Sequence, residues 1–216
     1  YEHLIRLDVV DSEKNVWSSY RFLTVKNDAD RPSTYIVHKE CGESKATFKE
    51  MKIRAKLGGI SGDKLKVESV TEIQPNTIQV FKIYFPEPLQ PGEEATIFYR
   101  IDWPNEPSAY YMKELSQSVS LIRYKKGVNK LTFAVFEPYK ILSSSLTEVD
   151  EMNVEHISNL LPVFMNISDE ELLKPLHDKQ YFGVKYVIDN PDGKAYQIKY
   201  IKEEIDDDED EDDDFF

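Results

Sequence analysis

The chain has 216 residues, with 40 acidic and 27 basic side chains and a formal net charge of −13. Its only cysteine, Cys41, excludes an internal disulfide and a structural zinc site built from thiolates. No run of about 18 apolar residues is present, as a membrane-spanning helix would require. A lone thiol favours a reducing compartment, so we expect a cytoplasmic protein.

The first third of the chain predicts successive β-strands. Apolar residues alternate with polar ones over residues 3–10, a second strand continues over residues 16–26, and a shorter strand follows the loop 27–32 at residues 34–38. Residues 48–57 predict a strand with one buried and one solvated face, because two sets of side chains alternate: Met51, Ile53, Ala55 and Leu57 against Lys52, Arg54 and Lys56. The glycine-rich residues 58–63 predict a turn before a strand at residues 65–73.

Residues 76–85 and 95–103 predict two further strands, joined by a segment with three prolines and Gly92. Proline and glycine at this density favour a stiff connection over a helix. The sequence Pro88-Leu89-Gln90-Pro91-Gly92-Glu93 resembles the linkers of immunoglobulin-like and arrestin-like sandwiches. Strands at residues 119–124 and 131–136 follow.

The pattern changes after residue 148. Residues 151–161 predict a helix, and Ser168 with Glu171 forms a capping box for a second short helix that ends near Pro175. Strands at 181–188 and 195–201 flank Asn190-Pro191-Asp192-Gly193, a type I turn sequence, and predict a hairpin.

The predicted fold is therefore mainly β, an antiparallel, immunoglobulin-like β-sandwich with one or two short helices. Its expected parts are a sandwich body at residues 1–148, a helical segment at 149–180, a β-hairpin at 181–202 packed on the body, and a disordered acidic tail at 203–216.

No catalytic or metal-binding motif is evident in the sequence. His38 and Cys41 are three residues apart, but no second histidine or cysteine cluster accompanies them. Gly58-Gly59-Ile60-Ser61-Gly62 lacks the lysine of a phosphate-binding loop and the spacing of a dinucleotide site. We therefore predict a protein that is not an enzyme and that has no cofactor and no metal.

A basic strip is expected between residues 45 and 66, where lysine and arginine greatly outnumber Glu50 and Asp63. On a solvated sheet face, such lysines block pairing between strand edges; alternatively, they bind an anionic partner. The residues of this possible anion-binding strip are Lys45, Lys49, Lys52, Arg54, Lys56, Lys64 and Lys66.

Large aromatic side chains offer a second candidate surface. Trp17 and Trp103 fit the core of a sandwich. The proline-rich segment from Trp103 to Tyr111 predicts a loop, so we expect Trp103, Tyr110 and Tyr111 to form a partner-binding patch.

The last residues form the most distinctive segment. Nine consecutive acids, residues 206–214, precede Phe215 and Phe216, and removing residues 203–216 leaves 29 acidic against 27 basic residues. Such a charged run is typical of a disordered segment. Asp212-Asp213-Asp214-Phe215-Phe216 resembles the tip of bacterial and phage single-stranded-DNA-binding proteins, although the usual Ile-Pro spacer is missing. The resemblance implies docking of the phenylalanines in an apolar pocket with basic side chains at its rim.

Two functions from different classes follow. The first is a non-catalytic protein-interaction module, an adaptor whose acidic, Phe-ended tail docks on a protein partner with a basic-rimmed apolar pocket. The second is a single-stranded nucleic-acid-binding protein, in which the tail competes for the basic strip. The near-neutral body favours the first, because nucleic-acid-binding proteins usually carry a basic excess. Neither function involves a membrane.

Overall fold

The computed structural model of the chain describes residues 1–11, 16–41, 46–74, 78–105, 117–123, 127–150, 155–168, 173–174, 180–191 and 194–203. Within these ranges, the side chains of residues 11, 41, 71–74 and 117–123 are not described.

The described residues are mainly β and contain no α-helix. Their strands are β1 (His3–Asp11), β2 (Val16–Lys26), β3 (Ser33–Cys41), β4 (Arg54–Leu57), β5 (Asp63–Leu65), β6 (Val67–Gln74), β7 (Ile78–Leu89), β8 (Glu94–Pro104), β9 (Gln117–Arg123), β10 (Lys130–Glu137), β11 (Ile141–Val149), β12 (Glu155–Ile157), β13 (Val163–Asn166), β14 (Phe182–Asp189) and β15 (Ala195–Lys202).

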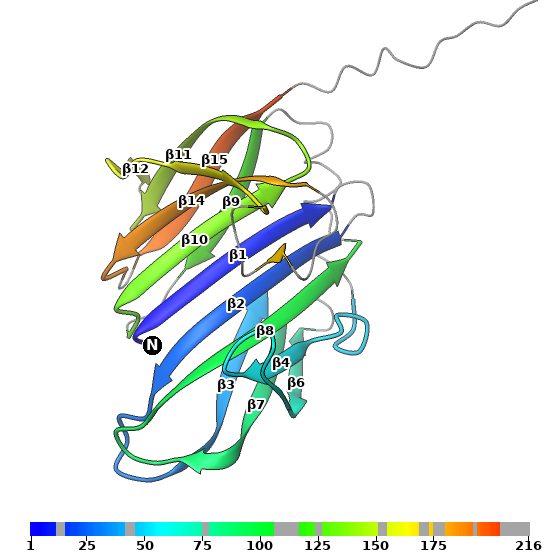
Figure 1. Ribbon diagram of the computed structural model, residues 1–216, viewed down its shortest axis with the longest axis vertical. Coiled ribbons are helices and arrows are strands. Elements are labelled where there is room, and N and C mark those ends of the chain that lie inside the picture. The colour runs from blue at the N-terminus through cyan, green and yellow to red at the C-terminus, as the bar shows by residue number, and fades with distance from the viewer. Residues whose placement is uncertain are drawn as a thin grey trace, which may run out of the picture.

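These strands form three sheets (Figure 1). A large sheet of eight strands has the order β13-β14-β10-β1-β2-β8-β4-β5. A four-stranded sheet (β12-β11-β15-β9) and a three-stranded sheet (β3-β7-β6) complete the described fold. In Figure 1 the four-stranded sheet lies at one end of the molecule and the three-stranded sheet at the other.

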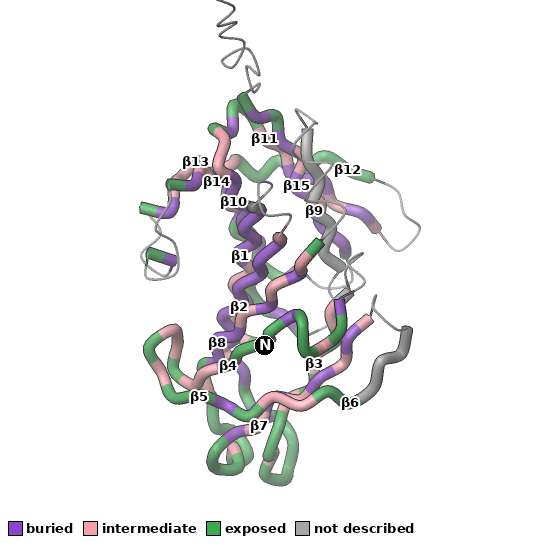
Figure 2. The backbone as a smooth tube through the Cα atoms, turned by 90° about the vertical axis from the view of Figure 1, so that its right-hand side faces the viewer, coloured by how far each residue is buried: buried purple, intermediate pink, exposed green. Residues whose placement is uncertain are grey.

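Alternation along the strands gives the large sheet two buried faces, because successive side chains point to opposite sides. On the inner face, Leu23, Ile97 and Phe133 belong to one core cluster together with Phe81 of the three-stranded sheet and Ile198 of the four-stranded sheet. Both smaller sheets therefore pack on this face, and Figure 2 shows buried backbone along the central strands.

The outer face of the large sheet carries a second cluster. Leu7, Tyr20, Phe98 and Phe136 are buried there together with side chains from the chain around β13, namely Ile167, Leu173 and Tyr181. Ile167, Leu173 and Tyr181 thus cover part of the outer face, and the large sheet is the middle layer of the described fold.

The predicted C-terminal hairpin is wrong, although both of its strands exist. β14 pairs with β10 and β13, whereas β15 pairs with β11 and β9. The chain at Asn190 and Pro191 passes from the large sheet to the four-stranded sheet, while Asp192 and Gly193 lie outside the described residues. Turn residues determine that the chain reverses; they do not determine which strand each arm pairs with.

The predicted helix at 151–161 is also wrong. Residues 155–157 form β12, which pairs with β11. Ile157, Leu160 and Leu161 follow the i, i+3, i+4 spacing of a helix face, but all three are exposed, so the helical pattern has no core behind it. Ser168 lies in a turn, and the rest of the predicted capping box, 169–171, lies outside the described residues.

The predicted strand at 48–57 is shorter, because only Arg54–Leu57 is extended. Residues before it form a turn in which Lys52 has a φ of 47°. The predicted immunoglobulin-like arrangement is not confirmed, since three sheets are present.

Candidate functional site

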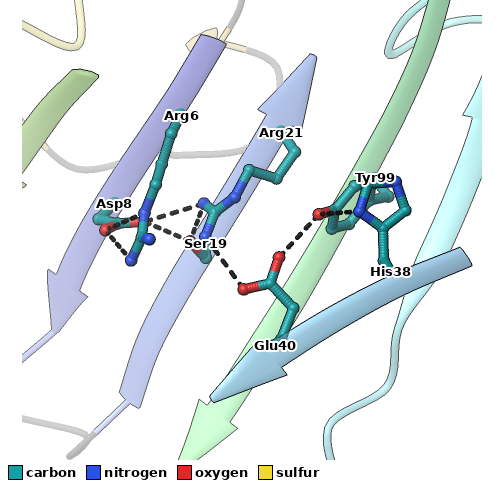
Figure 3. Close-up of polar contacts among 7 residues, drawn as sticks. All are labelled: Arg6, Asp8, Ser19, Arg21, His38, Glu40 and Tyr99. Atoms are coloured by element: carbon teal, nitrogen blue, oxygen red, sulfur yellow. Dashed lines mark hydrogen bonds and ion pairs between the residues drawn. The ribbon is translucent and has the colours of Figure 1, made fainter. Parts of the chain in front are cut away.

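A network of ionised and aromatic side chains lies between the large sheet and the three-stranded sheet (Figure 3). Arg21 of β2 donates from Nη1 to Asp8 Oδ1 at 3.1 Å and from Nη2 to Glu40 Oε2 at 3.5 Å. Arg6 Nε donates to Asp8 Oδ2 at 2.8 Å, and the Tyr99 hydroxyl donates to Glu40 Oε1 at 2.7 Å. Glu40 thus bonds β3 to β2 and β8, and His38 Nδ1 of β3 adds a contact to the Tyr99 hydroxyl at 3.5 Å.

The network is electrically balanced, with two arginines facing two carboxylates. Burial opposes ionisation of Asp8 and Glu40, but Arg6 and Arg21 lower the pKa of both carboxyl groups below their ordinary values. Burial lowers the pKa of His38 to about 4, so this imidazole is neutral at pH 7. Burial and the charge of Glu40 raise the pKa of Tyr99. Because each charge has a partner of opposite sign within the protein, the network holds the large sheet and the three-stranded sheet together. We call this network the clamp.

Gln79 lies beside this clamp and is the exception to its complete pairing. Its residue is opposite Glu40 in the β3–β7 ladder, and its side chain is fully buried. Among the described residues, neither Oε1 nor Nε2 of the Gln79 amide has a hydrogen-bond partner. An unpaired buried amide costs free energy, because water would satisfy it in the unfolded chain.

A second buried ion pair stands at the end of β15. Lys202 Nζ lies 3.1 Å from Glu137 Oε2, each side chain is 2% exposed, and the Tyr200 hydroxyl donates to Glu137 Oε1. Burial raises the pKa of Glu137, against the opposing effect of Lys202. This pair fixes the point at which the acidic segment, residues 203–216, leaves the folded strands.

Of the predicted partner-binding aromatics, Trp103 is not at the surface. It is 5% exposed and lies opposite Trp17 in the β2–β8 ladder, where both rings are part of the inner core. Trp103 is therefore a core residue, and its proposed role in a binding patch is wrong. Tyr110 and Tyr111 lie outside the described residues, as do Asp212, Asp213, Asp214, Phe215 and Phe216.

The fold divides the predicted basic strip. Lys56 of β4 and Lys64 of β5 are directly opposite each other, and Arg54 is two residues from Lys56 on the same face of the large sheet. Lys66 follows β5 and lies against the three-stranded sheet instead. Lys49 and Lys52 belong to the turn before β4, and Lys45 lies outside the described residues.

The outer face of the three-stranded sheet combines lysine and tyrosine. In the β3–β7 ladder Tyr35 is opposite Tyr84, Val37 is opposite Lys82, and Lys39 is opposite Val80, so these side chains share the face that points away from the core. We call this surface the lysine–tyrosine face; its members are Tyr35, Val37, Lys39, Lys66, Lys82 and Tyr84.

The two tyrosines of this face are held close together and are covered by ammonium groups. Their ring centroids are 5.6 Å apart. Lys82 Nζ lies 4.2 Å from the Tyr35 ring centroid, and Lys66 Nζ lies 5.0 Å from that of Tyr84. Glu68, which pairs with Lys66 at 2.6 Å, adds one acid to the face.

A third surface is the segment that links β12 to β13. Ile157 is 80% exposed and Leu161 84%, and Val163 and Phe164 are each about half exposed. The segment runs from an edge of the four-stranded sheet to an edge of the large sheet. Sequence reasoning missed this surface because the apolar spacing predicted a buried helix face. No local signal contradicted that helix, because Asp150 and Pro162 stand where a helix start and stop would place them.

Metal sites and membrane-spanning helices were the remaining kinds of feature that the described residues could contain. Within the described ranges, no three His, Cys, Asp or Glu side chains are grouped so that they could hold a metal ion. Nor does this described part include a helix with the length and apolar character needed to cross a membrane.

Comparison with known proteins identifies no family. No family model matches the chain, and no curated protein matches it. A solved structure with similarity is the crystal structure of the M1 zinc metallopeptidase from Deinococcus radiodurans, with a TM-score of 0.43 and 11% sequence identity. The match covers 91% of this chain and 41% of that one, so the chain spans about two fifths of the length of the structure it matches.

Proposed function

We propose that this chain is a non-catalytic protein-interaction module on a sandwich-like β scaffold, whose acidic segment and phenylalanines dock on a partner. The partner presents an apolar pocket with basic side chains at its rim. The observation that carries the proposal is the run of nine acids, residues 206–214, followed by Phe215 and Phe216. Acids supply long-range attraction and the rings supply burial. We place this activity in the cytoplasm.

Two features of the folded body support the proposal. The buried Lys202–Glu137 pair anchors β15 one residue before the acidic segment, which gives the segment a rigid base. The exposed side chains of the β12–β13 segment, above all Ile157 and Leu161, add apolar area of the kind that protein partners cover.

The test is a pull-down from cell extract with three forms of the intact chain: wild type, Phe215→Ala/Phe216→Ala, and a variant with Asp212, Asp213 and Asp214 changed to Asn. We expect a protein that wild type retains and both variants lose, because each variant removes one of the two contributions. Retention should also fall as salt rises from about 50 to about 500 mM. Identical sets of bound proteins for all three forms would contradict the proposal.

Single-stranded nucleic acid binding is a second candidate function. One observation favours it: Lys56 and Lys64 are directly opposite each other in the β4–β5 ladder, where like charges repel and attract an anion, while Lys56 Nζ also donates to Ile60 O. Fluorescence anisotropy with a labelled single-stranded oligonucleotide tests it. Binding that falls with salt and is lost in Lys56→Glu/Lys64→Glu would support this function, and no binding at low salt excludes it.

A further inference from the structure

The chain carries both halves of the interaction proposed above. One half is the acidic segment with its two phenylalanines. The other is the lysine–tyrosine face, where apolar and aromatic side chains (Val37, Tyr35, Tyr84) stand among ammonium groups (Lys39, Lys82). We propose that the lysine–tyrosine face binds the acidic segment, residues 203–216, of a second copy of this chain. This inference rests on the proposed function and names its partner, with an exposed apolar and basic sheet face in place of a pocket.

Charge complementarity is the first argument. The acidic segment contains 11 carboxylates and no basic residue. Of the face's lysines, Lys66 is already paired with Glu68, while Lys39 is exposed and, among the described residues, makes no ion pair. Lys82 Nζ lies over the Tyr35 ring at 4.2 Å, and its acidic neighbour in the β6–β7 ladder is Glu68, which is itself paired with Lys66. Lys39 and Lys82 are therefore the cations that approaching carboxylates meet.

Apolar exposure is the second argument. Val37 is 50% exposed and Tyr35 38%, on the side of the sheet opposite Phe81 and Ile83, which belong to the core. Val70, at the irregularity between β6 and β7, adds a further side chain that is 44% exposed. Phe215 and Phe216 can cover this area, and the acids before them can reach the neighbouring lysines.

The position of the lysines also favours an acidic peptide over a nucleic acid as the ligand of this face. Bases bind to exposed sheets by stacking on open aromatic rings. Here an ammonium group lies over each tyrosine, Lys82 over Tyr35 and Lys66 over Tyr84. Each ring therefore already has an ammonium group over it, which disfavours stacking of a base there, whereas Lys82 can still attract a carboxylate.

The arrangement of the sheets favours a second copy over docking within one chain. The acidic segment continues from β15, which lies in the four-stranded sheet, and Figure 1 shows that sheet at the opposite end of the molecule from β3, β6 and β7. Docking within one chain would require the segment to run back along the whole molecule. A second copy needs no such path, and because donor and receptor are different surfaces, the contact is head-to-tail.

Analytical ultracentrifugation of the intact chain tests the inference. At about 50 mM salt the average mass should rise with protein concentration up to about 100 µM, and at about 500 mM salt it should return to that of the monomer. Lys39→Glu/Lys82→Glu removes the receptor, and Phe215→Ala/Phe216→Ala weakens the donor. Each variant alone should associate at least about tenfold more weakly than wild type.

The decisive sample is an equimolar mixture of these two variants. The first retains an intact acidic segment and the second an intact face, so the mixture should form a dimer that grows no further. Lys56→Glu/Lys64→Glu is the matched control, with the same charge change on the large sheet, and should associate like wild type. Because Lys82 is half-buried, circular dichroism checks the fold of each variant, and Lys39→Glu alone, on an exposed side chain, repeats the test.

Three outcomes would overturn the inference: association that survives Lys39→Glu/Lys82→Glu, association abolished by the control, or monomers at every concentration. Binding of a single-stranded oligonucleotide that depends on Lys39 and Lys82, without self-association, would assign the face to nucleic acid instead. If the chain stays monomeric while its phenylalanine-dependent pull-down succeeds, this inference fails and the proposed function stands.

Discussion

At the scale of single residues, the described part of the chain places its buried charges where sheets meet. Arg21 joins Asp8 of the large sheet to Glu40 of the three-stranded sheet, and Lys202 joins Glu137 of β10 to the end of β15. Breaking such a pair by removing one partner is costly, because an uncompensated charge stays buried. Both pairs therefore tie the smaller sheets to the larger one in a single arrangement.

Because of the Asp8–Arg21–Glu40 network, we expect the protein to lose stability at acid pH. The folded-state pKa values of Asp8 and Glu40 lie below their ordinary values of 3.8 and 4.5, so the unfolded chain binds more protons in acid. The stabilisation is complete above about pH 4.5 and is lost as the pH falls through the folded-state pKa values. Glu137, whose pKa is raised, acts in the opposite direction.

Urea unfolding of wild type and Glu40→Gln at several pH values between about 7 and about 3 measures this effect. As the pH is lowered, we expect the free energy of unfolding of wild type to decrease. The decrease should be less steep in Glu40→Gln. Equal slopes for the two proteins would show that Glu40 ionises alike in the folded and unfolded states.

Replacing Gln79 by an apolar residue should stabilise the folded protein. The buried Gln79 amide has no partner among the described residues, so Gln79→Leu, which has a similar volume, should raise the free energy of unfolding by about 1–3 kcal/mol. Gln79→Asn keeps an amide and shortens the side chain, and should not stabilise. Chemical denaturation measures both, and a less stable Gln79→Leu would mean that the amide has a role the fold does not show.

At the scale of elements, the sequence located most strands and mistook some of their neighbours. Periodicity located β1 and β8, which are long and pair along their whole length with β2. It failed at β12 and β13, which are short, lie at sheet edges and expose apolar side chains. It also could not separate β14 from β15 into different sheets, because pairing partners are set by contacts distant in the sequence.

The pairing of β10 with β14 depends on a glycine. Gly183 lies opposite Phe136, and a Cβ at position 183 would come within 2.5 Å of the Phe136 ring. Gly183→Ala should therefore destabilise the protein by about 1–3 kcal/mol through overpacking. Val187→Ala, at an exposed position of the same strand, is the control and should change the urea midpoint little.

At the scale of the whole molecule, one core cluster contains side chains from all three sheets. This continuity predicts a single cooperative unfolding transition rather than separate melting of the two ends. Trp17 and Trp103, buried between β2 and β8, report on the large sheet by fluorescence, and far-UV circular dichroism reports on all strands. Coincident thermal transitions are expected, and two separated midpoints would mean that a smaller sheet unfolds independently.

The candidate sites were predictable only in part at this scale. The acids and phenylalanines of residues 206–216 can be recognised from the sequence alone, because they are consecutive and need no tertiary contact to bring them together. The lysine–tyrosine face is not, since Tyr35 and Tyr84 meet only through the β3–β7 register. The basic strip was predicted from proximity in sequence, and the fold assigns Lys64 and Lys66 to different sheets.

The place of β1 in the large sheet has a consequence for how the chain folds. β1 pairs with β2, which follows it directly, and also in parallel with β10, where Leu4 meets Leu131. During synthesis, β1 therefore keeps one open edge until most of the chain has emerged. Folding should be slow, because the entropy of closing the long loop between β1 and β10 is lost before the contacts between these strands form. Until then the nascent chain exposes a strand edge that other chains can pair with.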